Sequence, residues 1–291
     1  MNQKLKIVVA VGLILSLFLA ACNKNNLPET TPDNISNAVI IKWNEVAFET
    51  MGGSANQHSL LGSRIYAMVH MAMHDAVNAT QPRFETYAFE GKEPTANTEV
   101  AASSAAHGVL KNLFPARLSF LDSVLSNYLS TIPQGEPKTK GVVLSIEVAN
   151  ATLGLGHNSN GAQNHFGQPV PAVKPGDYKL VLPFDFIFAP FWEHSKLFSL
   201  ESKDQFRPLP PPALASEQYA IDFNEVKSVG LLASTTRTAD QSAFAKYWYE
   251  TSETGWNRIA RVVATERKPG LFKTARLFAL LNFAIADAYT A

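Results

Sequence analysis

The first candidates for a chemical role are two histidines whose spacing places them on one face of a helix. His70 and His74 stand four positions apart in a periodic segment, and Asp75 follows the second histidine. Helical zinc sites use histidines at this spacing. Asp75 lies about 100° around the helix from His74, so it cannot readily complete a ligand set. We therefore expect His70 and His74 to be hydrogen-bonded at a helix interface, and a metal site is the alternative. A third ligand would come from one of the remaining histidines, which include His107, His157, His165 and His194.

Other residues offer weaker chemistry. His157 and His165 lie in a segment rich in glycine and asparagine, where a solvated loop is favoured over a site. Arg207 and Lys203 could attract an oxyanion, because the arginine fork matches phosphate oxygens. The sequence contains no Gly-x-Ser-x-Gly elbow, phosphate-binding P-loop or dinucleotide fingerprint. These absences argue against a serine hydrolase or a nucleotide enzyme.

The start of the chain predicts export and a lipid anchor. Lys4 and Lys6 precede an apolar run, and Leu-Ala-Ala-Cys ends at Cys22. This order is typical of a secretory signal whose cleavage site resembles a lipobox, in which lipid is attached to the cysteine thiol. A retained transmembrane helix is the alternative, but the apolar run is only about 15 residues and a span needs about 20. We expect a signal peptide over residues 1–21, lipid on Cys22, a tether over 22–35, and anchoring to a membrane of the bacterial cell envelope, on its periplasmic or cell-surface side.

Composition narrows the class of the remaining chain. Hydrophobic residues make up 46% of the sequence, as in a globular protein, and Cys22 is its single cysteine. The exported part therefore has no disulfide, thiolate metal site or cysteine nucleophile. Lysine and arginine number 25, as do aspartate and glutamate, and there is no dense basic run. Nucleic acid is not an expected partner.

Hydrophobic periodicity and capping residues predict an all-α protein. The clearest pattern is a core helix over residues 60–79. Further helices are expected over residues 37–50, 98–114, from 119, 138–154, 216–230, from 238, 256–263 and 271–291. They fall into a first helical part over 36–153 and a second over 216–291. The apolar end of the second, from Leu277 to Ala291, is expected to be buried between other helices and lacks a stop signal, so we expect a chain shortened relative to its fold.

Between the two helical parts, residues 154–215 change character. Four glycines are followed by nine of the 17 prolines. Such a long excursion usually wraps a domain or carries function. Phe184, Phe186 and Phe188 alternate with Asp185 and Ile187, which predicts one short extended piece that lays aromatic rings against the helices. We expect little other strand.

Several segments in order resemble one family. Residues 64–79 (RIYAMVHMAMHDAVNA) resemble the early helix of bacterial vanadium-dependent haloperoxidases and related phosphoesterases of the type-2 phosphatidic acid phosphatase superfamily. The later matches cover residues 206–212, 222–227, 237–241, 256–260 and 275–288. Together the resemblance spans about residues 36–291 and concerns the N-terminal helical part of the family.

The resemblance implies a double four-helix-bundle architecture that binds vanadate or phosphate. The activity would be peroxide-dependent halide oxidation or phosphate-ester hydrolysis. In the family, the oxyanion is held by Lys-x6-Arg-Pro, Pro-Ser-Gly-His and Ser-Arg-x5-His motifs. We expect all three to be missing from residues 1–291, so we assign no catalytic residue and no resident cofactor, and we expect an inactive chain with an unknown substrate. The alternative is a non-catalytic surface lipoprotein that acts as a binding module.

Overall fold

The computed structural model describes residues 33–55, 58–158, 166–168 and 170–291. Cys22, the expected signal peptide and His165 lie outside these residues. Residues 35–291 form one unit of chain contacts, and the description below concerns that unit.

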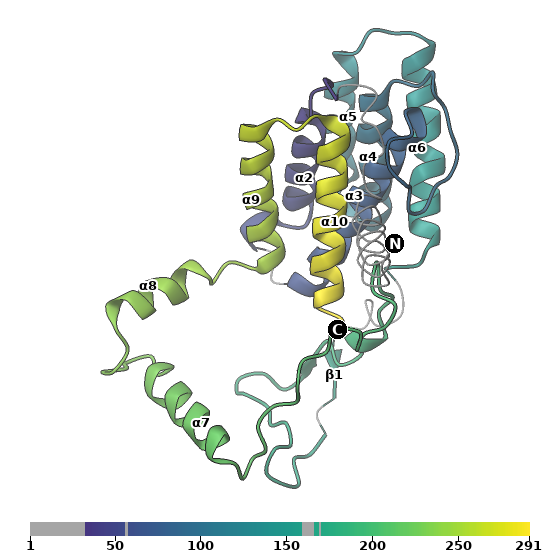
Figure 1. Cartoon of the computed structure of the whole chain (residues 1–291). Helices are drawn as coiled ribbons and strands as arrows, with labels where there is room; N and C mark the ends of the chain where they lie inside the picture. The colour runs from purple at the N-terminus through teal and green to yellow at the C-terminus, as the bar shows by residue number, and fades with distance from the viewer. Residues whose placement is uncertain (1–32, 56–57, 159–165, 169) are drawn as a thin grey trace, which may run out of the picture. The chain divides into compact units, whose positions relative to one another are not determined.

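Helices account for most of this unit, so the predicted all-α class is confirmed (Figure 1). The α-helices are α2 (Ala38–Thr50), α3 (Ser59–Thr80), α4 (Thr98–Leu113), α5 (Leu118–Ser130), α6 (Glu136–Gly154), α7 (Glu217–Val229), α8 (Ala239–Tyr247), α9 (Ser252–Arg267) and α10 (Leu271–Ala288). Short 3-10 turns occupy Gly53–Ala55, Pro115–Arg117 and Trp192–His194. The strands β1 (Phe166–Gly167) and β2 (Ile187–Phe188) pair antiparallel.

Side-chain caps begin four of the described α-helices, α3, α4, α7 and α8. Ser216 accepts a hydrogen bond from the Tyr219 amide, and Thr238 forms a capping box with Gln241. The helix predicted to begin at Thr98 is capped one residue earlier, by the Asn97 side chain on the Val100 amide. Helix α9 is longer than the predicted residues 256–263 and contacts α2, α3 and α10.

Helix α3 is the centre of the core. Every residue from Gly62 to Thr80 is buried, and α3 contacts α2, α4, α6, α9 and α10 (Figure 1). Helices α4 and α6 approach closely at Gly108, where an added Cβ would lie 2.7 Å from the Ala149 Cβ. The small residues of α4 therefore allow α6 to pack behind it.

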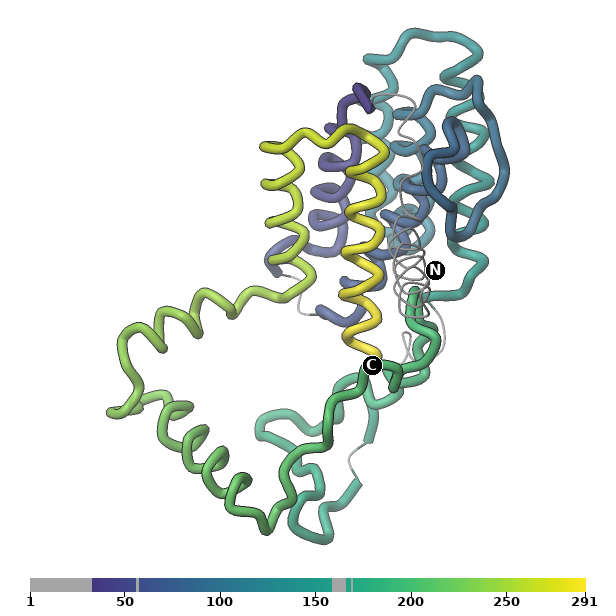
Figure 2. Tube along the Cα trace, viewed as in Figure 1, coloured from purple at the N-terminus to yellow at the C-terminus, as the bar shows by residue number. Residues whose placement is uncertain are grey.

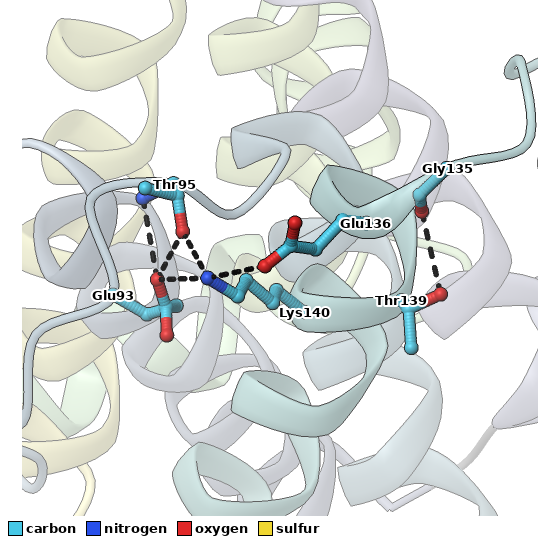
Figure 3. Close-up of polar contacts among 6 residues, drawn as sticks. All are labelled: Glu93, Thr95, Gly135, Glu136, Thr139 and Lys140. Carbon is cyan, nitrogen blue, oxygen red and sulfur yellow. Dashed lines mark hydrogen bonds and ion pairs between the residues drawn. The ribbon is translucent and has the colours of Figure 1, made fainter.

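A surface cluster joins the segment before α4 to the first turn of α6. Lys140 Nζ lies 2.9 Å from Glu136 Oε1 and 3.6 Å from Glu93 Oε1, and it donates to Thr95 Oγ1 at 2.7 Å (Figure 3). Exposed ion pairs of this kind each contribute only about 0.2–1 kcal/mol. The cluster fixes a connection and adds little to stability.

The segment between α6 and α9 is far less buried than the helices around α3. Figure 2 follows the chain from α6 through the Gly- and Pro-rich excursion to α7 and α8, neither of which contains a buried residue. The prediction that the phenylalanines lie against the helices is wrong for Phe184 and Phe186, whereas the ring centroid of Phe188 lies 4.9 Å from that of His58, which caps α3. Phe186 contacts Phe166 and Phe184, with ring centroids 4.8 and 5.7 Å apart, and Phe184 and Phe188 stay exposed. The rings pack on one another.

Helix α10 also departs from its expected burial. One face is buried, but Leu277, Leu280, Ala284 and Ala288 are exposed at helical spacing. No helix among the described residues is long and apolar enough to cross a membrane.

Candidate functional site

His70, the first predicted site residue, is fully buried where α2, α3, α9 and α10 meet. Its Nε2 lies 2.8 Å from Asn44 Nδ2, and its ring stacks on Phe278 with centroids 4.9 Å apart. Arg261 Nη1 donates to Asn44 Oδ1 at 2.5 Å, which fixes the orientation of the amide. The amide nitrogen therefore donates to an unprotonated Nε2. Burial, with a smaller effect of Arg261, lowers the pKa of His70 from 6.5 to about 3, so the ring is neutral at pH 7.

His74, one turn later, faces other atoms. Its Nε2 lies 2.9 Å from the Glu85 carbonyl oxygen, so this nitrogen carries the proton. Burial is the main cause of its lowered pKa. The structure thus gives His70 and His74 separate partners, one turn apart along α3. Across the described ranges, no three His, Cys, Asp or Glu side chains are grouped so that they could hold a metal ion.

The described histidines that were candidates for a third ligand, His107, His157 and His194, do not join this pair. His107 Nε2 lies 2.7 Å from Asp122 Oδ1, and His194 is exposed beside Glu193. The prediction of a solvated loop is wrong for His157, which is buried and stacks on Phe198 with centroids 3.9 Å apart. Burial, with a smaller effect of Arg64, lowers the pKa of His157 to about 4.

A buried polar centre surrounds His70, and the sequence did not predict it. We define it as Asn44, His70, Asn257, Arg261 and Asn282. Asn44 donates to Asn257 Oδ1 at 2.7 Å, and Asn257 donates to Asn282 Oδ1 at the same distance. Asn282 donates back to Asn257 Oδ1 at 3.1 Å. Because these amides are fully buried, each unmet hydrogen bond would cost about 1–3 kcal/mol.

The polar centre joins two similar helix pairs. Trp43-Asn44 in α2 corresponds to Trp256-Asn257 in α9, and residues 64–79 of α3 correspond to residues 276–291, which begin in α10. His70 then corresponds to Asn282, and each contacts the asparagine of its own pair. The sequence alone did not reveal this internal repeat, because few of the aligned positions are identical. The repeated Trp-Asn dipeptide was the available signal.

Two aspartates at equivalent positions bind loop backbone in the same way. Asp75 on α3 accepts from the amides of Tyr87, Ala88 and Phe89, at 2.7–3.0 Å. Asp287 on α10 accepts from the amides of residues 198, 199 and 200, also at 2.7–3.0 Å. Asp75, which directly follows His74, therefore anchors loop backbone.

Two arginines at equivalent positions in α3 and α10 lie beside the loops that the aspartates of the other helix pair bind. Arg64 on α3 places its guanidinium 5.0 Å from the ring centroid of Phe198, beside the loop that Asp287 holds. Arg276 on α10 places its guanidinium 4.9 Å from Phe84, near the loop that Asp75 holds. Each loop is thus contacted by an arginine from one helix pair and hydrogen-bonded by an aspartate from the other.

The arginines and histidines can be tested for their fit to vanadate or phosphate. The expectation that all three oxyanion motifs are missing is wrong for one spacing, since Ser63-Arg64 and His70 form Ser-Arg-x5-His. Arg64, however, donates to the His157 and Lys196 carbonyls, at 2.8 and 2.6 Å, whereas His70 binds Asn44. Burial lowers the pKa of Arg64 to about 10. These groups do not converge, so the arrangement does not fit a tetrahedral oxyanion, whose stabilisation takes several donors aimed at one point.

Lys203 and Arg207, the other residues considered for binding an oxyanion, also have separate contacts. Lys203 Nζ lies 2.9 Å from Glu193 Oε2 in an exposed ion pair. Arg207 is exposed and its amide donates to the Asp204 carbonyl. A hollow of about 340 Å³ lies elsewhere, and its lining includes Asn78, Phe84, Glu85 and Lys92. It adjoins the Asp75-bound loop rather than the polar centre.

The two helix pairs around the polar centre form a helical scaffold. Comparison with known proteins shows which fold it resembles. No protein-family model and no curated protein sequence matches the chain. Among solved structures, a bacterial vanadium-dependent iodoperoxidase is similar, with a TM-score of 0.71 and 22% sequence identity over 89% of this chain and 69% of that one. The chain therefore has a haloperoxidase-like fold, which confirms the resemblance at the level of fold.

Proposed function

We propose that this chain is an exported, lipid-anchored protein with a haloperoxidase-like helical scaffold, similar to the N-terminal part of a haloperoxidase or acid-phosphatase-like phosphoesterase. We further propose that residues 1–291 do not hold vanadate or phosphate by themselves and are inactive as given. The observation that carries the proposal is the fold similarity over 89% of the chain, combined with the way its buried cations are engaged.

The hydrogen bonds of Arg64 and Arg261 support the proposal that residues 1–291 do not hold vanadate or phosphate. Arg64 binds two backbone carbonyls, and Arg261 binds Asn44. His70 and His157 have pKa values of about 3 and 4, so they are neutral near pH 7 and add no positive charge. At Arg261 an oxyanion would have to displace the hydrogen bond to Asn44 and leave a buried amide unsatisfied. At Arg64, Nη1 has no hydrogen-bond partner among the described residues, but Nε and Nη2 already donate to two backbone carbonyls.

Vanadate binding tests this part directly. Equilibrium dialysis of the full chain with orthovanadate should show no saturable binding, and assays with a phosphate ester, or with vanadate, peroxide and bromide, should give no activity above background. The variants Arg64→Met and Arg261→Met should behave like the unchanged chain, as should the exposed control Arg117→Met. Stoichiometric vanadate binding that Arg64→Met or Arg261→Met abolishes, while Arg117→Met retains it, would overturn the proposal.

The lipid anchor has a separate test. We expect Cys22→Ser to move the protein from the membrane fraction to the soluble fraction of a bacterial host and to remove a diacylglyceryl mass from its N-terminal peptide. Asn26→Ser, in the same tether, serves as the matched control and should remain lipidated. An unmodified Cys22 in membrane-associated protein would instead favour the retained transmembrane helix.

A non-catalytic binding module is a second candidate, favoured by aromatic exposure on one segment. Phe244, Tyr247, Trp248 and Tyr249 are all more than half exposed at the end of α8 and just beyond it. Exposed aromatic groups often mark interaction sites. This function requires the chain to be stable alone, so it predicts a single cooperative thermal transition. A chain that binds ANS (8-anilinonaphthalene-1-sulfonate) strongly and lacks such a transition would argue against it.

A further inference from the structure

Arg64 is a fully buried cation, and its hydrogen bonds account for only part of its guanidinium. Nε and Nη2 donate to two backbone carbonyls, whereas Nη1 has no hydrogen-bond partner among the described residues. Burial lowers the pKa of Arg64 and the charge of Asp287 raises it, but that carboxylate is bound to three loop amides and forms no ion pair with the guanidinium. Arginine is almost never fully buried without a paired charge, so a counter-ion is to be expected at this place.

Two further unpartnered groups lie beside Arg64. Trp192 is 5% exposed, its ring centroid is 5.7 Å from the Arg64 guanidinium carbon, and its indole Nε1 has no partner within the described ranges. The same holds for the hydroxyl of Ser195, which is 6% exposed. Ser195 directly precedes Lys196, whose carbonyl accepts from Arg64 at 2.6 Å, and its own amide donates to the Trp192 carbonyl at 2.9 Å. Buried polar groups are normally satisfied, so three such groups together indicate a bound water or ion.

The chemistry of these three groups favours an anion over water. The two N–H groups of Arg64 Nη1 and the indole N–H of Trp192 can only donate, and the Ser195 hydroxyl can also donate. A water molecule would accept from at most two of them and would need acceptors for its own protons. An anion accepts from all of them and also offsets the buried positive charge.

The charges around His157 point the same way. Burial is the main cause of its lowered pKa, Arg64 and Lys196 lower the pKa further, and Asp287 raises it. Two cations and one carboxylate therefore act at this place, and the neutral His157 ring adds no charge. Residues 159–165, which follow in the sequence, contain no aspartate or glutamate.

We propose that Arg64 Nη1, Trp192 Nε1 and Ser195 Oγ bind one small monovalent anion of the size of chloride. The ion would join α3, which carries Arg64, to the Gly- and Pro-rich excursion, which carries Trp192 and Ser195. Phe198, whose ring centroid lies 5.0 Å from the guanidinium carbon, would help to keep water away. A tetrahedral oxyanion takes more donors aimed at one point, so the inference is separate from the proposed function and stands or falls independently of it.

Thermal unfolding of the full chain in sodium chloride, compared with sodium gluconate at equal ionic strength, tests the proposal. An anion that binds only the folded chain raises the melting temperature. We expect a saturable rise with chloride and none with gluconate, which is too large for the site. Trp192→Phe and Ser195→Ala each remove one donor and keep the guanidinium, so each should weaken the apparent chloride affinity by about tenfold. The control Trp248→Phe changes an exposed tryptophan and should leave that affinity unchanged.

Three results would overturn the proposal. The first is the same rise in both salts or in neither, and the second is unchanged chloride affinity in both Trp192→Phe and Ser195→Ala. The third comes from crystals of the unchanged chain grown with sodium bromide, which need no variant that might misfold. We expect an anomalous scattering peak within hydrogen-bond distance of Arg64 Nη1 and Trp192 Nε1, whereas density without an anomalous signal would identify an ordered water instead.

Discussion

The α2–α3 and α9–α10 pairs show how one arrangement of helices can have two levels of burial. Both carry a Trp-Asn dipeptide on the first helix and an arginine and an aspartate on the second, and their asparagines meet at the polar centre. Helix α4 covers only the first pair. The internal contacts of a helix pair and the covering of its outer face are therefore separate contributions to stability, and equivalent substitutions can measure each of them.

The largest difference is expected at the two tryptophans. Trp43→Ala should lower the free energy of unfolding by about 3–5 kcal/mol, because it leaves a cavity in the core. Trp256→Ala should cost about 1 kcal/mol or less, because that ring is half exposed. Chemical denaturation followed by circular dichroism measures both. Similar costs at the two sites would contradict the difference in covering.

The two aspartates should instead behave alike. Asp75→Ala and Asp287→Ala each leave three backbone amides without an acceptor, so each should lower the free energy of unfolding by about 3 kcal/mol. Hydrogen exchange should show the loss locally, at residues 87–89 for the first variant and 198–200 for the second. A variant that loses global stability but keeps slow exchange in its own loop would disprove the role of that carboxylate.

Acid should affect the α2–α3 and α9–α10 pairs differently, because His70 can be protonated and its counterpart in α10, Asn282, cannot. The pKa of His70 is about 3 in the folded protein and 6.5 is its ordinary value, so the unfolded chain binds more protons between these values. Stability should therefore fall as the pH decreases from about 6.5 toward 3. His70→Asn should flatten the dependence of the melting temperature on pH relative to the unchanged chain, while the other buried histidines retain their part. An unchanged slope would show that His70 is not buried in neutral form.

Two glycines test how closely α4 packs against α6. Gly108→Ala should cost about 1–2 kcal/mol, because its Cβ would meet the Ala149 Cβ at 2.7 Å. Gly154→Ala, with nothing within 4 Å of the added Cβ, should stabilise α6 by about 0.5–1 kcal/mol. Thermal melts compare the two variants. Equal effects would imply that α4 and α6 are not tightly packed.

The helices were predictable because their signals are local. Apolar spacing over residues 60–79 and the caps at Ser216 and Thr238 depend on neighbouring residues, and the structure shows helices at these places. The polar centre was not predictable, since Asn44 and Asn257 are far apart in the chain and an isolated asparagine is usually a surface or turn residue. The spacing of His70 and His74 left a metal site open as the alternative, but each ring has its own hydrogen-bond partner in a different neighbouring segment.

Local patterns in the sequence specify where helices form and which of their faces are apolar, and they carry the resemblance to a haloperoxidase-like fold. How those faces are used depends on tertiary contacts. These contacts direct Asp75 and Asp287 to loop amides, and they bury His157 against Phe198 in a segment that reads as a solvated loop. They also cover Trp43 and leave Trp256 open. The physical reason is that burial and hydrogen-bond partners depend on which distant helices come together, and local pattern does not encode that choice.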